Sequence, residues 1–383
     1  MKGIVRLLPR TYSIRDGRGN RRYPDLIEVA AQFRHSVNFF RDRREALRAG
    51  FEIFHAATFI AFVVFICHFM TVRTVLVYCL SVIFLALFIN TIWYHRYCSH
   101  RAFRFRQKAW AHIFLWLNPI GFREEIYALL HHIHHAIEDQ DDDPYGPHLG
   151  VFGSYVASAE FEIDTDMSVE EYERVKRSLA HIGMPFASLR SFRRWRAVEW
   201  IPHYLARWTF ATIFWSGLAY YAGGIPMCVT WFASVFTYTV LMRDFNYRGH
   251  SRPDEPAHIP GWDFDQRSQA LNQRFYGYVA GEWHNNHHSF RASANCGFGP
   301  YQLDLAFIII KLMHKIGIVE QFNNHQAQFE KKFMNQRDWQ HNLKVSAAGG
   351  GITDTQAAGV AYPDTSLRPF VKEAGKECCG EER

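Results

Sequence analysis

Residues 74–100 read TVLVYCLSVIFLALFINTIWYHRYCSH, and this stretch decides which class of fold the chain can adopt. From Thr74 to Tyr94 it contains no Asp, Glu, Lys or Arg. An uncharged apolar run of about 18 or more residues is typical of a helix that spans a bilayer. The run leads directly into His95 and, shortly after it, His100. The stretch therefore predicts a transmembrane helix that carries histidines at one end.

Two further regions of the chain are apolar and uncharged. Ile53–Met70 precedes the first run and is separated from it by a link of three residues. Trp208–Met242 is 35 residues long, and as one helix it would extend about 52 Å, far beyond an apolar layer of about 30 Å. Its middle reads Gly-Gly-Ile-Pro at 223–226, a strong turn signal, so we interpret it as a second hairpin. We predict an all-α multi-pass membrane protein with four transmembrane helices in two hairpins, at about residues 53–70, 74–94, 205–222 and 226–245.

Basic residues predict which side of the membrane each segment faces. Five arginines crowd the entrance to the first span, whereas the 71–73 link contributes one and the 223–226 turn none. Because basic residues stay on the cytoplasmic side, the N-terminus is expected inside the cell. Four spans then return residues 95–200 and 246–383 to that side, together with the C-terminus. These segments are expected to form a cytoplasmic helical cap.

The rest of the chain divides by composition. Residues 1–50 are polar and basic and form a cytoplasmic N-terminal segment, residues 51–344 form the membrane domain, and residues 345–383 are Gly/Ala/Thr-rich and expected to be disordered. The lipid bilayer is therefore one expected partner. The net charge of +6 is modest for a chain of 383 residues, and we predict no nucleic-acid partner.

Histidines are the outstanding feature of the composition, since the chain has 21 and many lie close together. Two clusters, at 131–135 and 284–288, share the spacing H-x-x-H-H, which places all three imidazoles on one face of a helix. His95 and His100 are five residues apart, so either a helix ends between them or they serve different ions. Asn246 and His250 follow the fourth predicted span at helical spacing. The candidate metal ligands are His95, His100, His131, His134, His135, His250, His284, His287 and His288.

This set predicts a transition-metal site because neutral imidazole is the commonest protein ligand for such metals. Nine imidazoles exceed the needs of one ion, which implies two ions. Structural zinc would favour thiolates, and only Cys98 lies within any cluster. Copper would also accept imidazole ligands, but iron is favoured because neutral ligands with open positions suit reactions with O₂.

These motifs resemble the membrane fatty-acyl desaturase family, and within it the stearoyl-CoA (Δ9-type) branch. The matching segments are HRYCSHRAF at 95–103, H-x-x-H-H from His131, N-x-x-x-H from Asn246, and GEWHNNHH at 281–288. The acidic stretch at 139–144 also resembles the family pattern. The resemblance covers about residues 50–320, and the set of spacings is specific although each motif alone is not.

The resemblance implies a di-iron site in which these nine histidines hold two iron ions and Asn246 reaches one iron through a water molecule. It implies an oxidoreductase that uses O₂ as co-substrate and introduces a double bond into a saturated acyl chain, carried as acyl-CoA or acyl-lipid. Four positions depart from the pattern, since Tyr127 stands where Trp is usual, Leu129 and Leu130 replace polar residues, and Tyr145 replaces a frequent His. These departures concern the expected substrate channel. Of the properties that the resemblance implies, the identity of the substrate is therefore the one it predicts least well.

Electrons must come from a separate donor, either cytochrome b5 or ferredoxin with its reductase, because the sequence contains no dinucleotide-binding or haem-domain motif. The lack of a fused donor domain favours a bacterial inner membrane over endoplasmic reticulum. Two other outcomes stay open at the same site, a di-iron membrane hydroxylase and a fatty acid decarboxylase that forms terminal alkenes. A non-catalytic metal carrier is a further alternative, but it predicts ionisable residues inside the spans.

Overall fold

The computed structural model describes residues 5–156, 162–251, 263–265, 268–299 and 301–334. Within them the regular structure is almost entirely helical, and β1 (Phe103–Phe105) and β2 (Val319–Phe322) pair as a small antiparallel sheet. The α-helices in chain order are α1 (Leu26–Ser36), α2 (Ala46–Val64), α3 (Val72–Phe84), α4 (Lys108–Leu117), α5 (Glu124–His134), α6 (Gly150–Tyr155), α7 (Val169–Leu179), α8 (Leu189–Trp195), α9 (Ile201–Gly249), α10 (Arg274–Ala280), α11 (His284–Ser289), α12 (Leu305–Lys315) and α13 (Gln326–Phe329). The predicted tail, residues 345–383, lies outside the described residues.

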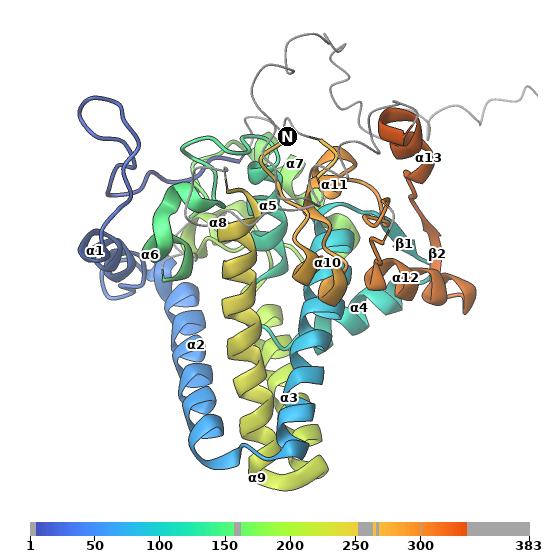
Figure 1. Cartoon of the computed structure of the whole chain (residues 1–383). Coiled ribbons are helices and arrows are strands. Elements are labelled where there is room, and N and C mark those ends of the chain that lie inside the picture. Colours follow the sequence, from blue (N-terminus) through green and yellow to red (C-terminus); the bar gives the residue numbers. More distant parts are fainter. Residues whose placement is uncertain (1–4, 157–161, 252–262, 266–267, 300, 335–383) are drawn as a thin grey trace, which may run out of the picture.

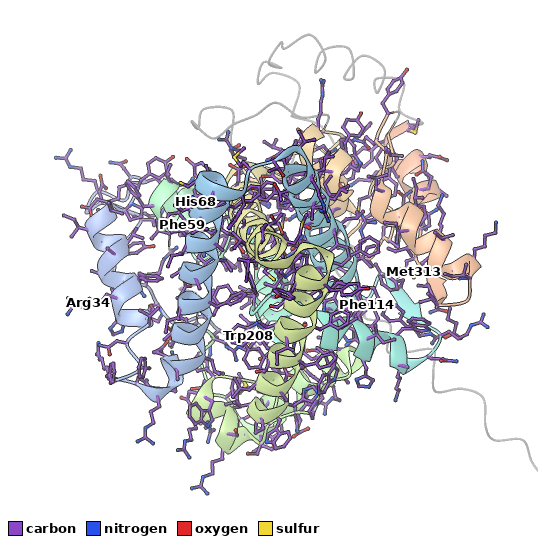
Figure 2. The ribbon with its side chains drawn as sticks, turned by 90° about the horizontal axis from the view of Figure 1, so that it is seen from below. Arg34, Phe59, His68, Phe114, Trp208 and Met313 are labelled. Carbon is purple, nitrogen blue, oxygen red and sulfur yellow. The ribbon has the colours of Figure 1, made fainter. Side chains whose placement is uncertain are left out.

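Three helical segments of the described chain are long and apolar enough to cross a membrane, namely Arg43–Phe69, Val72–Ser99 and Ile201–Gly249. They form the lower part of the molecule, and the short helices gather at their upper end (Figure 1). Apolar side chains such as Ile53, Phe59 and Ile60 are exposed on the outer surface of α2, as the view from below illustrates for Phe59 (Figure 2). Exposed apolar surface of this kind fits contact with lipid. The predicted class, a helical membrane protein with a histidine-rich cluster, is confirmed, and the number of crossings stays a prediction.

The link between α2 and α3 is short because Thr71 ends one helix region and caps the next. The side chain of Thr71 accepts a hydrogen bond from the backbone N–H of Thr74, and the Thr74 hydroxyl accepts one from the N–H of Thr71, which forms a capping box. Arg73 then donates a hydrogen bond to the carbonyl oxygen of Ala222 at 2.7 Å. The α2–α3 link and the middle of α9 therefore lie at the same end of the bundle.

Helix α9 consists of two helical arms that fold back on each other. The backbone is not helical at Gly223 and Gly224, and Gly224 has a φ of +68°, which favours glycine. On either side of this break, the rings of Trp215 and Trp231 stack with their centroids 4.7 Å apart. The Gly-Gly-Ile-Pro turn signal thus marks a reversal of the chain. The reversal explains why the apolar run is longer than a single bilayer crossing requires.

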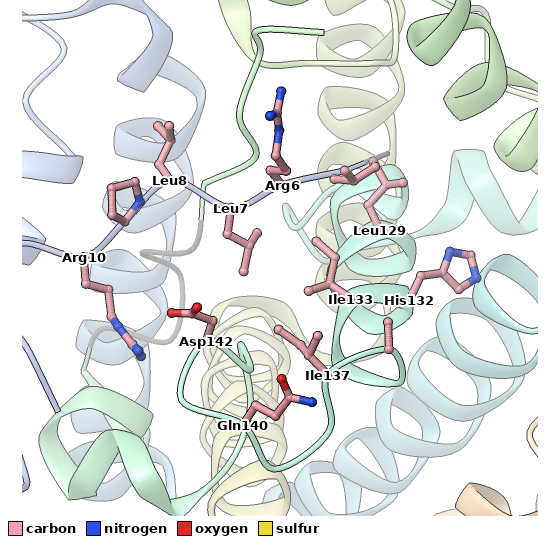
Figure 3. A pocket seen from close by; sticks show the side chains of 13 residues that line it. Arg6, Leu7, Leu8, Arg10, Leu129, His132, Ile133, Ile137, Gln140 and Asp142 are labelled. Atoms are coloured by element: carbon pink, nitrogen blue, oxygen red, sulfur yellow. The ribbon is translucent and has the colours of Figure 1, made fainter. Parts of the chain in front are cut away.

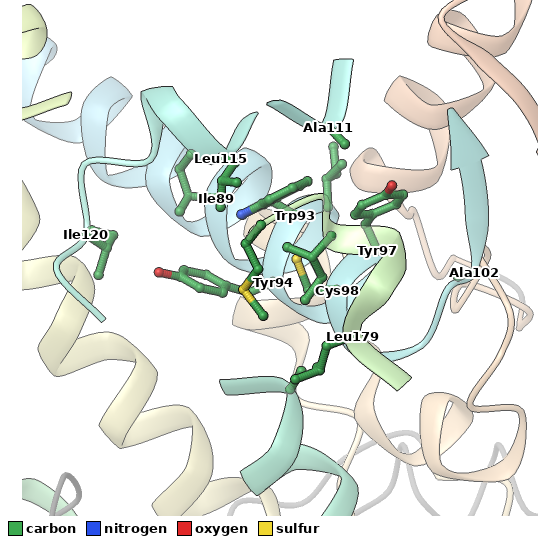
Figure 4. Close-up of a cluster of buried hydrophobic side chains, with 14 of the residues drawn as sticks. Ile89, Trp93, Tyr94, Tyr97, Cys98, Ala102, Ala111, Leu115, Ile120 and Leu179 are labelled. Atoms are coloured by element: carbon green, nitrogen blue, oxygen red, sulfur yellow. The ribbon is translucent and has the colours of Figure 1, made fainter. Parts of the chain in front are cut away.

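The helix that follows α3 has π-helical geometry over Leu85–Ser99, and we refer to it as η3. Such geometry is uncommon and is often found at functional sites. Nearly every side chain of η3 is buried, and its centre packs in the core around Trp93, Tyr94 and Tyr97 (Figure 4). This rigid segment carries the first histidine motif out of the apolar bundle.

A buried ionic cluster fixes the start of α5 against the first arm of α9. One terminal nitrogen of Arg207 lies 2.5 Å from a Glu124 carboxylate oxygen and 2.7 Å from one of Glu199. Both carboxylates are fully buried, and breaking such a pair generally costs about 3–5 kcal/mol. Arg207 therefore determines where α5, which carries the second histidine motif, begins.

Candidate metal centre

Helix α5 presents the second histidine motif toward the centre of the cap. Glu124 and Glu125 lie in its first turn, where negative charge stabilises a helix, and the motif occupies its last turn. His135 caps the C-terminus and retains helical dihedral angles, so the helical spacing of His131, His134 and His135 is preserved.

The third histidine motif lies on the short helix α11, which follows α10 after a tight turn. Gly281 ends α10 in the left-handed conformation with a φ of +74°. A Cβ at this position would lie 2.5 Å from Oδ1 of Asp304, so the turn has room only for glycine. This turn positions Glu282 and the motif at 284–288 beside η3.

The first histidine motif reaches the same region through the end of η3. The backbone N–H of His100 bonds to the carbonyl of His95 at 3.2 Å, the five-residue spacing of a π-helix. The helix ends at Ser99, between the two histidines, and their ring centroids lie 5.0 Å apart. Of the two arrangements open for this pair, the structure shows a helix end between them and both rings in one cluster.

The predicted ligands converge in two groups, and the ring nitrogens within each group all lie within 4.8 Å of one another. The first group comprises His95, His100, His131, His135 and His287. The Nε2 separations are 2.7 Å for His100–His131 and 3.0 Å for His131–His135, His135–His287 and His95–His287. Two nitrogens bound at right angles to one ion at about 2.1 Å lie about 3 Å apart, so these separations fit a shared metal ion.

The second group comprises His134, His250, His284 and His288. His250 lies immediately beyond the end of α9, and its Nε2 is 2.7 Å from that of His284. The Nε2 atoms of His134 and His288 lie 3.4 Å apart. Each H-x-x-H-H motif is therefore divided between the two groups. His134 lies in the second group while the other two histidines of its motif lie in the first, and His287 lies in the first group while the other two of its motif lie in the second.

Hydrogen bonding among the imidazoles alone does not satisfy these groups. A neutral imidazole offers one donor and one acceptor nitrogen, and His131, His135 and His287 each have two Nε2 neighbours within about 3 Å. Every histidine of both groups other than His100 is at most 8% exposed, so bulk solvent does not supply the missing partners. Buried polar groups without partners are costly, and the donor set thus fits metal ions better than it fits an empty cluster.

Carboxylates face the second ring nitrogen of several histidines. Nδ1 of His95 lies 2.8 Å from Glu282, and Nδ1 of His134 lies 2.8 Å from Asp143. Nδ1 of His250 and of His288 lie 3.1 Å from Asp139 and 2.8 Å from Glu138, respectively. The contacts of His95, His134 and His250 are hydrogen bonds, and such bonds fix the ring orientation and tautomer of metal-binding histidines. Nδ1 of His288 is close to Glu138 but lacks hydrogen-bond geometry.

Burial favours the neutral, metal-binding form of several of these histidines. Burial, with a further contribution from neighbouring histidines, lowers the pKa of His131, His135, His284, His287 and His288 well below the ordinary value. His250 differs because Asp139 and other nearby carboxylates outweigh the effect of burial and raise its pKa.

The comparison with protein families decides which kind of protein has this arrangement. The family model described as "Fatty acid desaturase" matches residues 73–311, more than half of the chain. The chain belongs to the fatty acid desaturase family. All nine predicted histidine ligands and Asn246 fall within the matched residues.

Individual relatives of this desaturase-family chain have low sequence identity to it. The Delta-9 desaturase-like 2 protein of Arabidopsis thaliana is 27% identical over 243 residues, covering 60% of this chain and 70% of the relative. The Delta-9 acyl-lipid desaturase 1 of Arabidopsis thaliana is 25% identical over 60% of this chain and 68% of its own length. The icosanoyl-CoA 5-desaturase of Limnanthes douglasii is 25% identical over 60% of this chain and 59% of its own length. These names support an oxidoreductase that acts on fatty acyl chains.

Asn246 and two unpredicted tyrosines line a small cavity in the desaturase-family chain. The cavity has a volume of about 40 Å³ and is bordered by His95 and His131 from the first group and His134 and His284 from the second. Tyr127 and Tyr145 also line it. The sequence identified these tyrosines only as departures from the family pattern. How close they lie to the candidate ligands depends on how α5 packs against the loop that follows it.

Histidines outside the two groups have other partners. Nε2 of His132 lies 2.7 Å from the carbonyl oxygen of Ser99, and His181 contacts the carbonyl oxygens of Tyr97 and Cys98. His203 pairs with Glu199 at 2.6 Å. Each of these side chains therefore supports the fold around the site.

A larger cavity of about 640 Å³ lies on another face of α5, between this helix and residues 5–10 (Figure 3). Leu129, Ile133 and Ile137 contribute to its apolar lining. The residue 5–10 segment is held by backbone bonds on both sides of Ile163, from Leu8 to Glu162 and from Asp164 to Arg6. None of the nine histidines lines this cavity, so it is separate from the two histidine groups.

Proposed function

We propose that this protein is an O₂-dependent fatty acyl desaturase whose nine histidines hold two iron ions. The observation that carries the proposal is the convergence of the imidazole nitrogens into two groups with separations near 3 Å in a chain of the fatty acid desaturase family. The first group would hold one iron and the second group the other, with Asn246 reaching one of them through a water molecule.

Iron is proposed because of the reaction that the family name implies. When bound, the two irons would supply the oxidising power to remove hydrogen from an unactivated methylene, which no side-chain acid or base can do. In the balanced reaction, O₂, two electrons and two protons convert a saturated acyl chain into a monounsaturated chain and two water molecules. Imidazole ligands without thiolates suit a metal that must keep positions open for O₂.

The protein itself supplies position and exclusion of water. Met242 and Phe245, on the last turns of α9, give the small cavity an apolar wall against which a methylene can rest. Burial of the histidines keeps solvent away from the reacting carbon. The carboxylates at Nδ1 hold the rings in place while the substrate binds and leaves.

Substrate carrier, electron donor and membrane topology are part of the same proposal. The printed names of the relatives include both an acyl-lipid and an acyl-CoA desaturase, which supports either carrier here. Electrons would come from a separate protein, cytochrome b5 or ferredoxin with its reductase. The two arms of α9, together with α2 and α3, would give four crossings with the histidines on the cytoplasmic side.

The decisive experiment is expression in a host that lacks unsaturated-lipid synthesis, followed by mass spectrometry of its lipids. The wild-type chain should produce a monounsaturated acyl chain and contain about two irons per protein by metal analysis. His287→Ala should abolish the product, because His287 lies 3.0 Å from two other ring nitrogens of the first group. His132→Ala is the matched control, since His132 lies on α5 but belongs to neither group.

The same experiment identifies the alternatives. A hydroxylated chain would indicate a di-iron hydroxylase, and a shortened terminal alkene would indicate a decarboxylase. A protein that contains zinc and consumes no O₂ would contradict the proposal and favour a metal carrier.

A further inference from the structure

The small cavity lies between the two histidine groups rather than beside one of them. Two of its histidines, His95 and His131, belong to the first group, and His134 and His284 belong to the second. Its volume of about 40 Å³ is enough for one molecule of the size of water. A small ligand in this cavity would therefore be within reach of both groups.

Two tyrosines, Tyr127 and Tyr145, line this space. The ring of Tyr145 lies 5.1 Å from that of His134, and the ring of Tyr127 lies 5.9 Å from that of His131. Among the described residues, neither phenol oxygen makes a hydrogen bond. Nearby buried phenols behave differently, since Tyr94 donates to the carbonyl of Phe122 and Tyr238 donates to Asn90.

Both tyrosines are half-buried and border the cavity, so a ligand in this space can accept a hydrogen bond from each phenol. Both are neutral donors at physiological pH. Beside its four histidines, the cavity has polar lining from these phenols, Asn90, Asn246 and the carboxylate of Glu282, and apolar lining from Met242 and Phe245. The phenols and Asn246 offer hydrogen bonds to an oxygen atom, while the apolar lining offers none.

We propose that Tyr127 and Tyr145 donate hydrogen bonds to a small oxygen ligand, O₂ or an oxygen species derived from it, held between the two histidine groups. This inference rests on the proposed function, because it assumes that the groups hold iron. Negative charge develops on oxygen as O₂ is reduced, and donors already aimed at that charge stabilise it. The apolar lining would then keep the acyl methylene next to the oxygen.

The test uses nitric oxide, which binds ferrous iron in the place of O₂ and gives a spectroscopic signal. Reduced, iron-loaded Tyr127→Phe, Tyr145→Phe and the double variant are titrated with nitric oxide, with affinity calculated per bound iron. Loss of one hydrogen bond should weaken nitric oxide binding by about tenfold in each single variant, with iron content and melting temperature unchanged. Stability should not fall because neither hydroxyl has a protein partner to lose.

Tyr172→Phe is the matched control, because this buried tyrosine on α7 donates to the carbonyl of Ala187 at 2.9 Å and lines no part of the cavity. It should lower the melting temperature and leave nitric oxide affinity unchanged.

Nitric oxide affinities within twofold of wild type in all three variants would overturn the inference while leaving the proposed function intact. Loss of iron from either single variant would also overturn it, because the phenol would then act by placing the histidines. A wild-type protein without iron would overturn the proposed function and this inference with it.

Discussion

At the scale of single residues, the arrangement depends on imidazoles whose two nitrogens have different partners. Nε2 faces the other histidines, and Nδ1 of four of the rings faces a carboxylate. Among these carboxylates Glu282 is 2% exposed and contacts His95, a member of the first group. The carboxylates therefore determine how firmly the nitrogens are held for metal binding.

Glu282→Gln is expected to weaken iron binding by about 10–100-fold. The amide can still accept a hydrogen bond from His95, but it lacks the negative charge that raises the basicity of the ring. Competition against a calibrated chelator measures the affinity. Glu173→Gln, which removes a carboxylate from the surface of α7, is the control and should bind iron as the wild type does. Equal affinities for the two variants would show that the Glu282 charge has no part in metal binding.

A second residue-scale prediction concerns Glu125, which is fully buried in the first turn of α5. Burial raises the pKa of its carboxyl from 4.5 to about 7, against the opposing effect of Arg123. The folded protein thus binds this proton more tightly than the unfolded chain, so the free energy of unfolding falls as the pH rises from about 4.5 to 7 and then levels off.

Glu125→Gln should remove that pH dependence. At pH 8 the variant is expected to be more stable by about 3 kcal/mol, and below about pH 4.5 the two proteins should match. Melting temperatures of the detergent-solubilised proteins across this range provide the measurement. A difference that is the same at every pH would contradict the assignment.

At the scale of elements, α5 and α11 each contribute histidines to both groups. Helix α5 contributes His131 and His135 to the first group and His134 to the second, and α11 contributes His287 to the first and His284 and His288 to the second. The relative rotation of α5, α11 and η3 therefore controls both groups together. The turn at Gly281 fixes α11 in this arrangement.

Gly281→Ala is expected to disturb the centre through this turn. The left-handed conformation alone costs a non-glycine residue about 1–2 kcal/mol, and the new Cβ would also lie 2.5 Å from Asp304. Gly19→Ala separates these effects, because Gly19 has a φ of +82° but no atom within 4 Å of the added carbon. Melting temperature should fall in both variants and further for Gly281→Ala, which alone should lose iron on metal analysis. Unchanged iron content in Gly281→Ala would argue against a role for the turn.

At the scale of the whole molecule, the centre joins segments that are distant in the chain. His95 and His287 are 192 residues apart, yet their Nε2 atoms lie 3.0 Å from each other. A ligand that binds only the folded arrangement stabilises it by mass action. Metal binding is therefore expected to hold the cap together as a unit.

Removal of iron by a strong chelator should accordingly lower the melting temperature. For a site loaded at 100 times its dissociation constant, the free energy of unfolding should fall by about 3 kcal/mol or more. The effect should reverse when ferrous iron is restored. In His287→Ala, whose first group lacks one histidine, removal of iron should change the melting temperature much less. A melting temperature that does not depend on iron would contradict a structural contribution from the metal.

The helical membrane class could be predicted from the sequence, because uncharged apolar runs of this length are typical of membrane-spanning helices. Helical spacing placed the six histidines of the two H-x-x-H-H sets on shared helix faces, and the short motifs at 95–100 and 246–250, together with the resemblance to the desaturase family, added His95, His100 and His250 as candidate ligands. The Gly-Gly-Ile-Pro turn signal likewise indicated the reversal within α9.

Only the tertiary structure decided how those histidines divide into two groups, because the division depends on how α5, α11 and η3 are rotated against one another. It likewise brought Tyr127 and Tyr145 to one cavity, although 18 residues separate them in the chain. Spacing along a helix is a local property fixed by backbone geometry, whereas contact between helices depends on side-chain packing across the whole cap. For this reason candidate ligands can be predicted one motif at a time, whereas their partition into two groups and their neighbours cannot.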